Sequence, residues 1–117
     1  MKIYQGATYK IPTQIEIDNK ILNIDDTKKI EFAFGEDLIK TYPSKNKDIE
    51  RSGNKLIVFL SSDDTLSLPA DKVLRVQSRI TFDDGSVKFT KSEPIAIVST
   101  QFSKSGGEIF DDWNCKT

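Results

Sequence analysis

Apolar and polar residues alternate with a period of two along most of this 117-residue sequence. Such a period places successive side chains on opposite faces of a strand, so it predicts β-strands with one buried face. The clearest runs carry apolar residues at Tyr9, Ile11, Ile15 and Ile17, at Ile30, Phe32 and Phe34, and at Leu74, Val76, Ile80 and Phe82. Residues 56–60 are apolar at every position, which predicts a strand that is covered on both faces.

Turn-forming residues separate these runs and mark the remaining elements. Asp18-Asn19-Lys20 is typical of a turn between two strands. Clustered Asp and Ser residues followed by Pro69 favour a single helical turn that crosses between sheets. The pattern predicts a short strand over 37–42, a loop over 43–53, the helical turn within 63–70 and a final strand over 95–99.

Residues 73–90 form the clearest hairpin of the sequence. Asp84-Gly85 is a favoured two-residue turn, in which Gly85 takes a positive φ. This turn places Phe82 opposite Val87 and Ile80 opposite Phe89, so that both apolar pairs face the core. We therefore expect Phe89 to be a core residue.

About seven short strands without an amphipathic helix predict an all-β protein with an antiparallel β-sandwich. Residues 1–102 would form this single domain, whose size allows one hydrophobic core. Residues 103–107 have the composition of a linker, so residues 103–117 are predicted to be a flexible C-terminal tail. Ile109, Phe110 and Trp113 are unusually apolar for such a tail. They are candidates for contact with a partner or for packing on their own domain.

The charge balance of the sequence argues against a nucleic-acid partner. Seventeen basic and eighteen acidic residues give a formal net charge of −1, whereas nucleic-acid-binding proteins usually carry a basic excess. No apolar run approaches the roughly 20 residues of a membrane span, and residues 1–10 alternate unlike a signal peptide. We therefore expect synthesis in the cytoplasm, no nucleic-acid partner and no membrane span.

Few residues of the sequence are suited to catalysis or to metal binding. Histidine is absent and Cys115 is the single cysteine, so the commonest general base and the usual zinc ligands are missing. Three Asp pairs remain as candidate acids or calcium ligands. Turn and capping roles explain Asp63-Asp64 and Asp83-Asp84 better, and Asp111-Asp112 lie in the predicted tail. We expect no enzyme activity, no cofactor and no metal.

Several phrases of the sequence resemble the small Ig-like modules of phage and prophage structural proteins from Gram-positive bacteria. The likeness is strongest to the N-terminal domain of baseplate upper proteins and related tail-fibre proteins. The phrases are Ile3-Tyr4-Gln5-Gly6-Ala7-Thr8, Leu22-Asn23-Ile24-Asp25-Asp26-Thr27, Ser61-Ser62-Asp63-Asp64-Thr65, Asp84-Gly85, and Ser92-Glu93-Pro94-Ile95-Ala96-Ile97-Val98.

This resemblance covers about residues 1–100 and implies a virion structural or assembly role in a baseplate, tail or head–tail region. The module would act through protein–protein contacts with other virion proteins or with itself as a homo-oligomer. It would reach the virion if the phage is functional. The alternative is an Ig-like module that binds carbohydrate or a cell surface, which a cluster of exposed aromatic side chains would favour.

Overall fold

The computed structural model describes residues 2–46, 48–100, 107–108 and 115–116, the last four by their backbone alone. The chain is mostly β, as predicted, with one short α-helix and one 3₁₀ turn among the described residues. The strands are β1 (Lys2–Tyr4), β2 (Ala7–Gln14), β3 (Glu16–Ile17), β4 (Lys20–Ile21), β5 (Thr27–Phe34), β6 (Leu38–Tyr42), β7 (Ile49–Ser52), β8 (Lys55–Leu60), β9 (Val73–Phe82), β10 (Val87–Phe89), β11 (Glu93–Val98), β12 (Gly107–Glu108) and β13 (Cys115–Lys116). The helical segments are η1 (Ile24–Asp26) and α1 (Ser62–Ser67).

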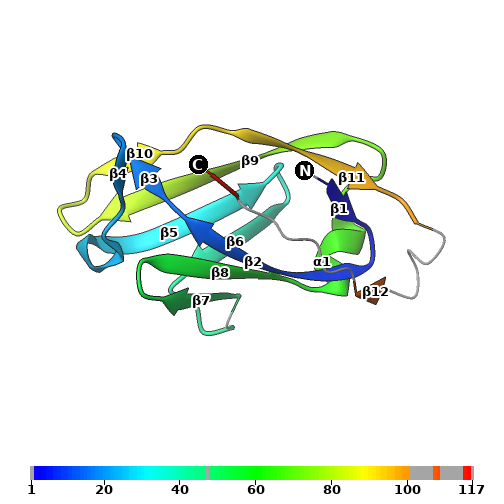
Figure 1. Ribbon diagram of the computed structural model, residues 1–117, viewed down its shortest axis with the longest axis horizontal. Helices are drawn as coiled ribbons and strands as arrows, with labels where there is room; N and C mark the ends of the chain where they lie inside the picture. Colours follow the sequence, from blue (N-terminus) through cyan, green and yellow to red (C-terminus); the bar gives the residue numbers. More distant parts are fainter. Residues whose placement is uncertain (1, 47, 101–106, 109–114, 117) are drawn as a thin grey trace.

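Two larger sheets share one hydrophobic core (Figure 1). The six-stranded sheet has the order β1-β11-β9-β5-β6, with β10 paired to β9. The five-stranded sheet has the order β12-β2-β8-β7, with β13 paired to β2, and β3 and β4 form a separate hairpin. Buried side chains of both sheets belong to a single cluster that includes Ile3, Ile11, Ile30, Phe32, Leu56, Val58, Ile80, Ile95 and Ile97.

The predicted alternation is confirmed on the main strands. In β2 the buried and exposed residues alternate strictly from Ala7 to Thr13, and in β5 Ile30, Phe32 and Phe34 are buried. In β9 the core side carries Val76, Ser78 and Ile80. Because the side-chain period of a strand is two, each of these faces follows directly from the sequence.

The helical turn before Pro69 is also confirmed. Ser61 caps α1, since its hydroxyl accepts a hydrogen bond from the Asp64 N–H and the Asp64 carboxylate accepts one from the Ser61 N–H. This reciprocal arrangement is a capping box. The helix connects β8 of the five-stranded sheet to β9 of the six-stranded sheet, so it crosses between the sheets as expected.

Two expectations about the strands are wrong. The loop predicted over residues 43–53 contains β7, in which Ile49 is buried and the next three residues are exposed polar positions. One apolar residue is too weak a pattern to mark a strand. The structure also describes thirteen strands where about seven were expected, and several of the additional ones are only two or three residues long.

The predicted register of the β9–β10 hairpin is wrong by one residue. Val87 lies opposite Thr81, and Phe89 lies opposite Arg79. The Phe82 N–H donates to the Ser86 carbonyl and the Gly85 N–H donates to the Phe82 carbonyl, both at 2.9 Å. The loop is therefore a three-residue turn that ends in glycine, and the predicted positive φ of Gly85 is confirmed at 88°.

The side chain of Asp84 explains why the longer turn forms. Its Oδ1 accepts hydrogen bonds from the Ser86 N–H at 2.8 Å and from the Ser86 hydroxyl at 2.6 Å. These two hydrogen bonds lower the pKa of the Asp84 carboxyl. They also draw Ser86 to the end of the strand ladder, whereas a two-residue turn would have paired Ser86 with Asp83.

Candidate binding surface

A β-bulge separates β10 from β11 on the strand that returns along β9. Phe89 pairs with Arg79 in β10, whereas Glu93 pairs with Val76 in β11. The returning strand thus advances four residues while β9 advances three. One additional residue must lie between the two pairs, within residues 90–92, which defines a bulge.

Ser78 and Thr90 fix this bulge inside the protein. Both are buried, and their hydroxyl oxygens are 2.7 Å apart. The Ser78 N–H donates to Thr90 Oγ1 at 3.0 Å, and the Thr90 N–H donates to the Ser78 carbonyl at 3.0 Å. The Gln77 amide donates to the Thr90 carbonyl at 2.9 Å. Buried polar groups are costly without partners, so these bonds hold the irregular backbone in one conformation.

The bulge decides which side chains of the returning strand face solvent. Beyond it, in β11, Ile95 and Ile97 are buried in the core. Before it, in β10, Val87 and Phe89 point outward and are 48% and 59% exposed. The expectation that Phe89 belongs to the core is therefore wrong, because one additional residue moves all of β10 to the opposite face.

In addition to its pairing with β9, β10 contacts the β3–β4 hairpin through an ion pair. Lys88 donates to Asp18 Oδ2 at 2.8 Å. Hydrogen bonding and charge attraction from Lys88 lower the pKa of the Asp18 carboxyl. Asp18 and Asn19 form the predicted turn and both have a positive φ. This ion pair is exposed and contributes little stability, but it links the two hairpins at one end of the molecule (Figure 1).

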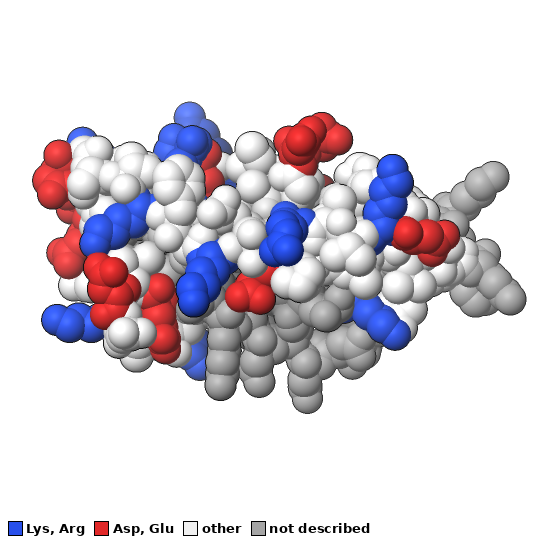
Figure 2. Space-filling view, turned by 90° about the horizontal axis from the view of Figure 1, so that it is seen from above, with Lys and Arg blue, Asp and Glu red and all other residues white. Residues whose placement is uncertain are grey.

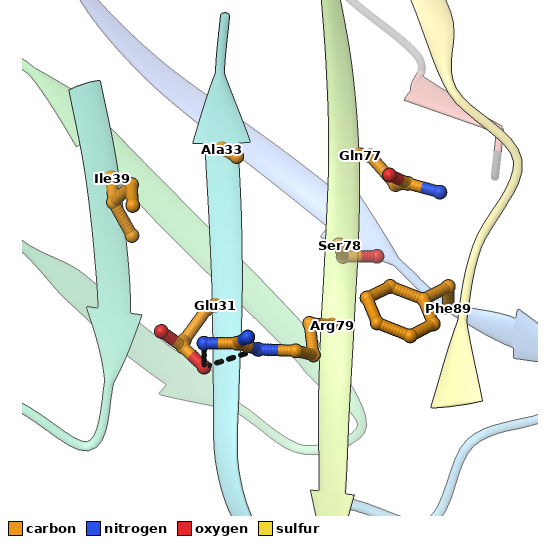
Figure 3. Close-up of a pocket in the computed structure, with 7 residues that line it drawn as sticks. All are labelled: Glu31, Ala33, Ile39, Gln77, Ser78, Arg79 and Phe89. Carbon is orange, nitrogen blue, oxygen red and sulfur yellow. Dashed lines mark hydrogen bonds and ion pairs between the residues drawn. The ribbon is translucent and has the colours of Figure 1, made fainter. Parts of the chain in front are cut away.

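A shallow hollow lies on the outer face of the six-stranded sheet, across β6, β5, β9 and β10 (Figure 3). Its volume is about 160 Å³. Ile39 on β6 stands at one margin and Phe89 on β10 at the other, with the short side chain of Ala33 between them. The lining residues are Glu31, Ala33, Ile39, Gln77, Ser78, Arg79 and Phe89.

Cross-strand pairing explains how these side chains meet. Ile39, Ala33 and Gln77 are directly opposite one another on β6, β5 and β9. The next row on the same face contains Glu31, Arg79 and Phe89. Directly paired residues point to the same side of a sheet. The apolar margins are exposed, since Ile39 is 53% and Phe89 59% accessible.

An ion pair crosses the hollow. Arg79 donates to Glu31 Oε1 through Nε at 2.9 Å, and its Nη2 lies 2.8 Å from the same oxygen. Lys29 Nζ lies 3.5 Å from Glu31 Oε1. The Glu31 side chain is only 13% exposed, whereas those of Lys29 and Arg79 are about half exposed. Two cations therefore face solvent around one shielded carboxylate.

Further basic side chains lie on the strands of this outer face. Arg75 lies on the same side of β9 and donates to the Ser92 carbonyl at 3.3 Å, next to the bulge. Lys2 shares this side because it pairs with Ala96, which pairs with Val73. Among the described residues, the outward side chains of these strands include Lys2, Lys29, Arg75 and Arg79 as cations and Glu31 as the acid. Figure 2 shows the molecule from the side on which β9, β10 and β11 lie in Figure 1, and acidic side chains are also present on this side of the molecule.

A second group of charges lies between the edges of the two sheets. Lys40 on β6 points inward and is 6% exposed. Its Nζ lies 2.7 Å from Asp64 Oδ2 on α1 and 3.3 Å from Asp48 Oδ1 before β7. Burial tends to raise the pKa of Asp64, but hydrogen bonds from Lys40 and Ser61 outweigh it, so this pKa is lowered. The group joins three elements, and we assign it a structural role.

The contact residues predicted from the sequence, Ile109, Phe110 and Trp113, lie outside the described residues. The strands on either side of them are described: β12 pairs in parallel with Ala7 and Thr8, and β13 with Thr13 and Gln14. The sequence pattern did not predict the surface around Phe89, because the exposure of Phe89 depends on the bulge. The signal in the sequence was Ser78, a polar residue on the core side of β9.

The described part of the chain contains no group of three or more His, Cys, Asp or Glu residues that could hold a metal ion. Within the same residues, no helix has the length and apolar character that crossing a membrane requires. No model of a known protein family matches the sequence, and no curated protein matches it.

Proposed function

We propose that the chain is an Ig-like module. In variable-type immunoglobulin domains one sheet contains strands G, F, C and C′, and the other contains A, B, E and D. The β11-β9-β5-β6 order corresponds to G-F-C-C′, and β2-β8-β7 corresponds to B-E-D. A turn at Gly6 separates β1, which pairs with β11 in parallel, from β2, which lies in the other sheet. The remaining strands are short additions to this arrangement.

We further propose that this module is a phage-derived virion structural or assembly protein that acts through protein–protein contacts. The observation that carries the contact role is the outward position of Phe89, which a bulge with buried hydrogen bonds maintains. Bulges often redirect a side chain next to a functional site, and aromatic residues are enriched in interfaces. The resemblance of the sequence phrases to baseplate and tail-fibre modules supports a partner within the phage particle.

The alternative is a module that binds carbohydrate or a cell surface. An aromatic ring that lines the same hollow as Gln77 and Arg79 is compatible with sugar binding. However, the hollow of about 160 Å³ is smaller than the roughly 300–1,000 Å³ of pockets that enclose a small molecule. Phe89 is also the one aromatic residue among the large exposed apolar side chains of the described part. A shallow face with apolar margins suits a protein surface better.

The test is incorporation into particles. The bacterium that carries the gene would be induced to release phage, and purified particles would be analysed by quantitative mass spectrometry. We expect the chain at a fixed copy number per particle, and we expect Phe89→Ser to reduce that number while Val73→Ser, equally exposed on the same face, does not. A chain that remains in the cell extract and is absent from particles contradicts the virion role. Retention of the free protein on purified cell-wall glycans would favour the alternative.

A further inference from the structure

We propose that the outer face of the six-stranded sheet binds an acidic protein segment, which places one apolar side chain in the hollow between Ile39 and Phe89. This inference rests on the proposed contact role and adds the site and the chemistry of the partner. The buried charge group of Lys40 with its two aspartates is satisfied within the fold and offers no comparable surface.

The shape of the hollow supports a single inserted side chain. Ala33 leaves open space because it has only a methyl group, while the larger side chains of Ile39 and Phe89 lie at the two margins. A volume of about 160 Å³ is the order of one large side chain. Apolar anchors of this kind dominate many interfaces when a surrounding polar rim excludes water.

The charges around the hollow determine which net charge the bound segment should carry. Arg79 lines the hollow, and Lys29 and Arg75 lie on the same face. The nearby Glu31 is mostly shielded and already has two cationic partners. An approaching carboxylate therefore meets exposed guanidinium and ammonium groups, whereas an approaching cation meets repulsion. Complementary charge acts mainly on specificity and on the rate of association.

The bulge makes this surface rigid before the partner binds. Thr90 and Ser78 share three hydrogen bonds inside the protein, so Phe89 is held outward without any ligand. A preformed anchor loses less conformational entropy when it binds. Without the bulge, regular pairing of this strand with β9 would place Phe89 on the same side as Ile95 and Ile97, which are buried.

The experiment uses the full chain, labelled with nitrogen-15, and three synthetic peptides as probes. The first is Glu-Glu-Gly-Phe-Gly-Glu-Glu, the second replaces each Glu with Lys, and the third replaces Phe with Ala. We expect the first peptide to shift the amide signals of Ala33, Ile39, Gln77, Arg79 and Phe89 in a saturable manner. We expect the other two to bind at least about tenfold more weakly, because one lacks the complementary charge and the other lacks the anchor.

Variants of the protein locate the site. Phe89→Ser and Arg75→Gln should weaken binding of the acidic peptide, and the matched controls Val73→Ser and Lys55→Gln should leave it unchanged within about twofold. Each exposed ion pair changes affinity by less than about fivefold, so Arg75→Gln should have the smaller effect. Equal binding of the Glu and Lys peptides, or signal changes confined to β2 and α1, would overturn the proposal.

Self-association that Phe89→Ser abolishes, without peptide binding, would instead identify a second copy as the occupant. Detection in particles tests the virion role separately, so the two proposals can fail independently.

Discussion

The hydroxyl of Thr65 accepts a hydrogen bond from the backbone N–H of Gly6 at 2.9 Å. The same hydroxyl donates to the carbonyl of Ala7 at 2.8 Å, and Thr65 is fully buried. Gly6, with a φ of 83°, lies in the turn where the chain passes from β1 in the six-stranded sheet to β2 in the five-stranded sheet. The contact therefore joins two of the sequence phrases that resemble phage Ig-like modules, and it gives both phrases a structural role.

Replacing Thr65 with Val should destabilise the protein by about 2–3 kcal/mol. The substitution preserves the shape of the side chain but leaves the buried Gly6 N–H without its partner. Thr65→Ser retains the hydroxyl and should cost about 1 kcal/mol, since it removes one buried methyl group. Urea denaturation followed by circular dichroism would measure both. Equal losses in the two variants would show that the methyl group matters and the hydrogen bond does not.

The Asp64 carboxyl should make stability depend on pH. Its pKa is lower in the folded protein than in the unfolded chain, because the hydrogen bonds from Lys40 and Ser61 outweigh burial. The folded state therefore binds fewer protons, and stability falls as the pH is lowered through the acid range, from about 5 to about 2. Asp64→Asn should reduce this fall. The carboxyls of Asp18, Asp25 and Asp84 also have lowered pKa values, so a smaller slope should remain.

The free energy of unfolding of both proteins would be measured at several pH values between 2 and 7 at constant salt. Lys40→Met is the matched variant, since it removes the cation but retains the carboxyl and its Ser61 partner. It should also flatten the acid dependence. If both variants keep the slope of the natural protein, the pH dependence arises from other carboxyls.

Gly85 should resist substitution because of its backbone conformation. A Cβ atom built at this position has no neighbour within 4 Å, and φ is 88°. Side-chain collision is therefore excluded, and the cost comes from the positive φ alone. Gly85→Val should lose at least about 1–2 kcal/mol, whereas Gly85→Asn should lose less, because Asn tolerates this region. A loss below about 0.3 kcal/mol for Val, typical of a neutral surface change, would contradict the turn.

Thr90 should matter more for stability than Ser78, although they form one pair. Thr90→Val leaves the buried Ser78 N–H without its acceptor, with an expected cost of about 1–3 kcal/mol. Ser78→Ala removes only one side-chain hydroxyl and should cost about 1 kcal/mol. Chemical denaturation compares the two, with Thr90→Ser as the variant that keeps the hydroxyl. The opposite order would mean that the Ser78 hydroxyl, and not the backbone contact, fixes the bulge.

The side-chain alternation predicted the core faces of β2, β5 and β9 because a period of two depends only on local sequence. The Ser61–Thr65 phrase predicted α1 for the same reason, since its cap is local. The candidate surface was not predictable in this way. The position of Phe89 depends on a bulge whose hydrogen bonds join residues twelve positions apart in the chain. The apolar character of Phe89 also favoured the incorrect register.

Lys40 shows the second limit of local patterns. Its neighbours predict a strand, but nothing in residues 37–42 indicates that the lysine faces inward. Its partners come from two later elements, Asp48 and Asp64. Because β6 ends its sheet among the described strands, an inward-facing charge at this position discourages pairing with another strand. Such a role appears only after the edges of the sheets are known.

The last prediction concerns removal of residues 103–117. The buried apolar residues of the described part all lie at or before Ile97, so truncation after residue 102 should leave the fold stable to within about 1 kcal/mol. The change should instead appear at the edge of β2, where β12 and β13 pair with Ala7, Thr8, Thr13 and Gln14. Hydrogen exchange should become faster at those of these four amides that point toward β12 and β13, while exchange in β9 should stay unchanged. An uncovered edge also favours strand pairing between copies, so light scattering should detect more association.

If the mass in solution falls, Ile109, Phe110 or Trp113 provides a subunit contact. If the truncated protein unfolds, the segment belongs to the core and the boundary at residue 102 is wrong.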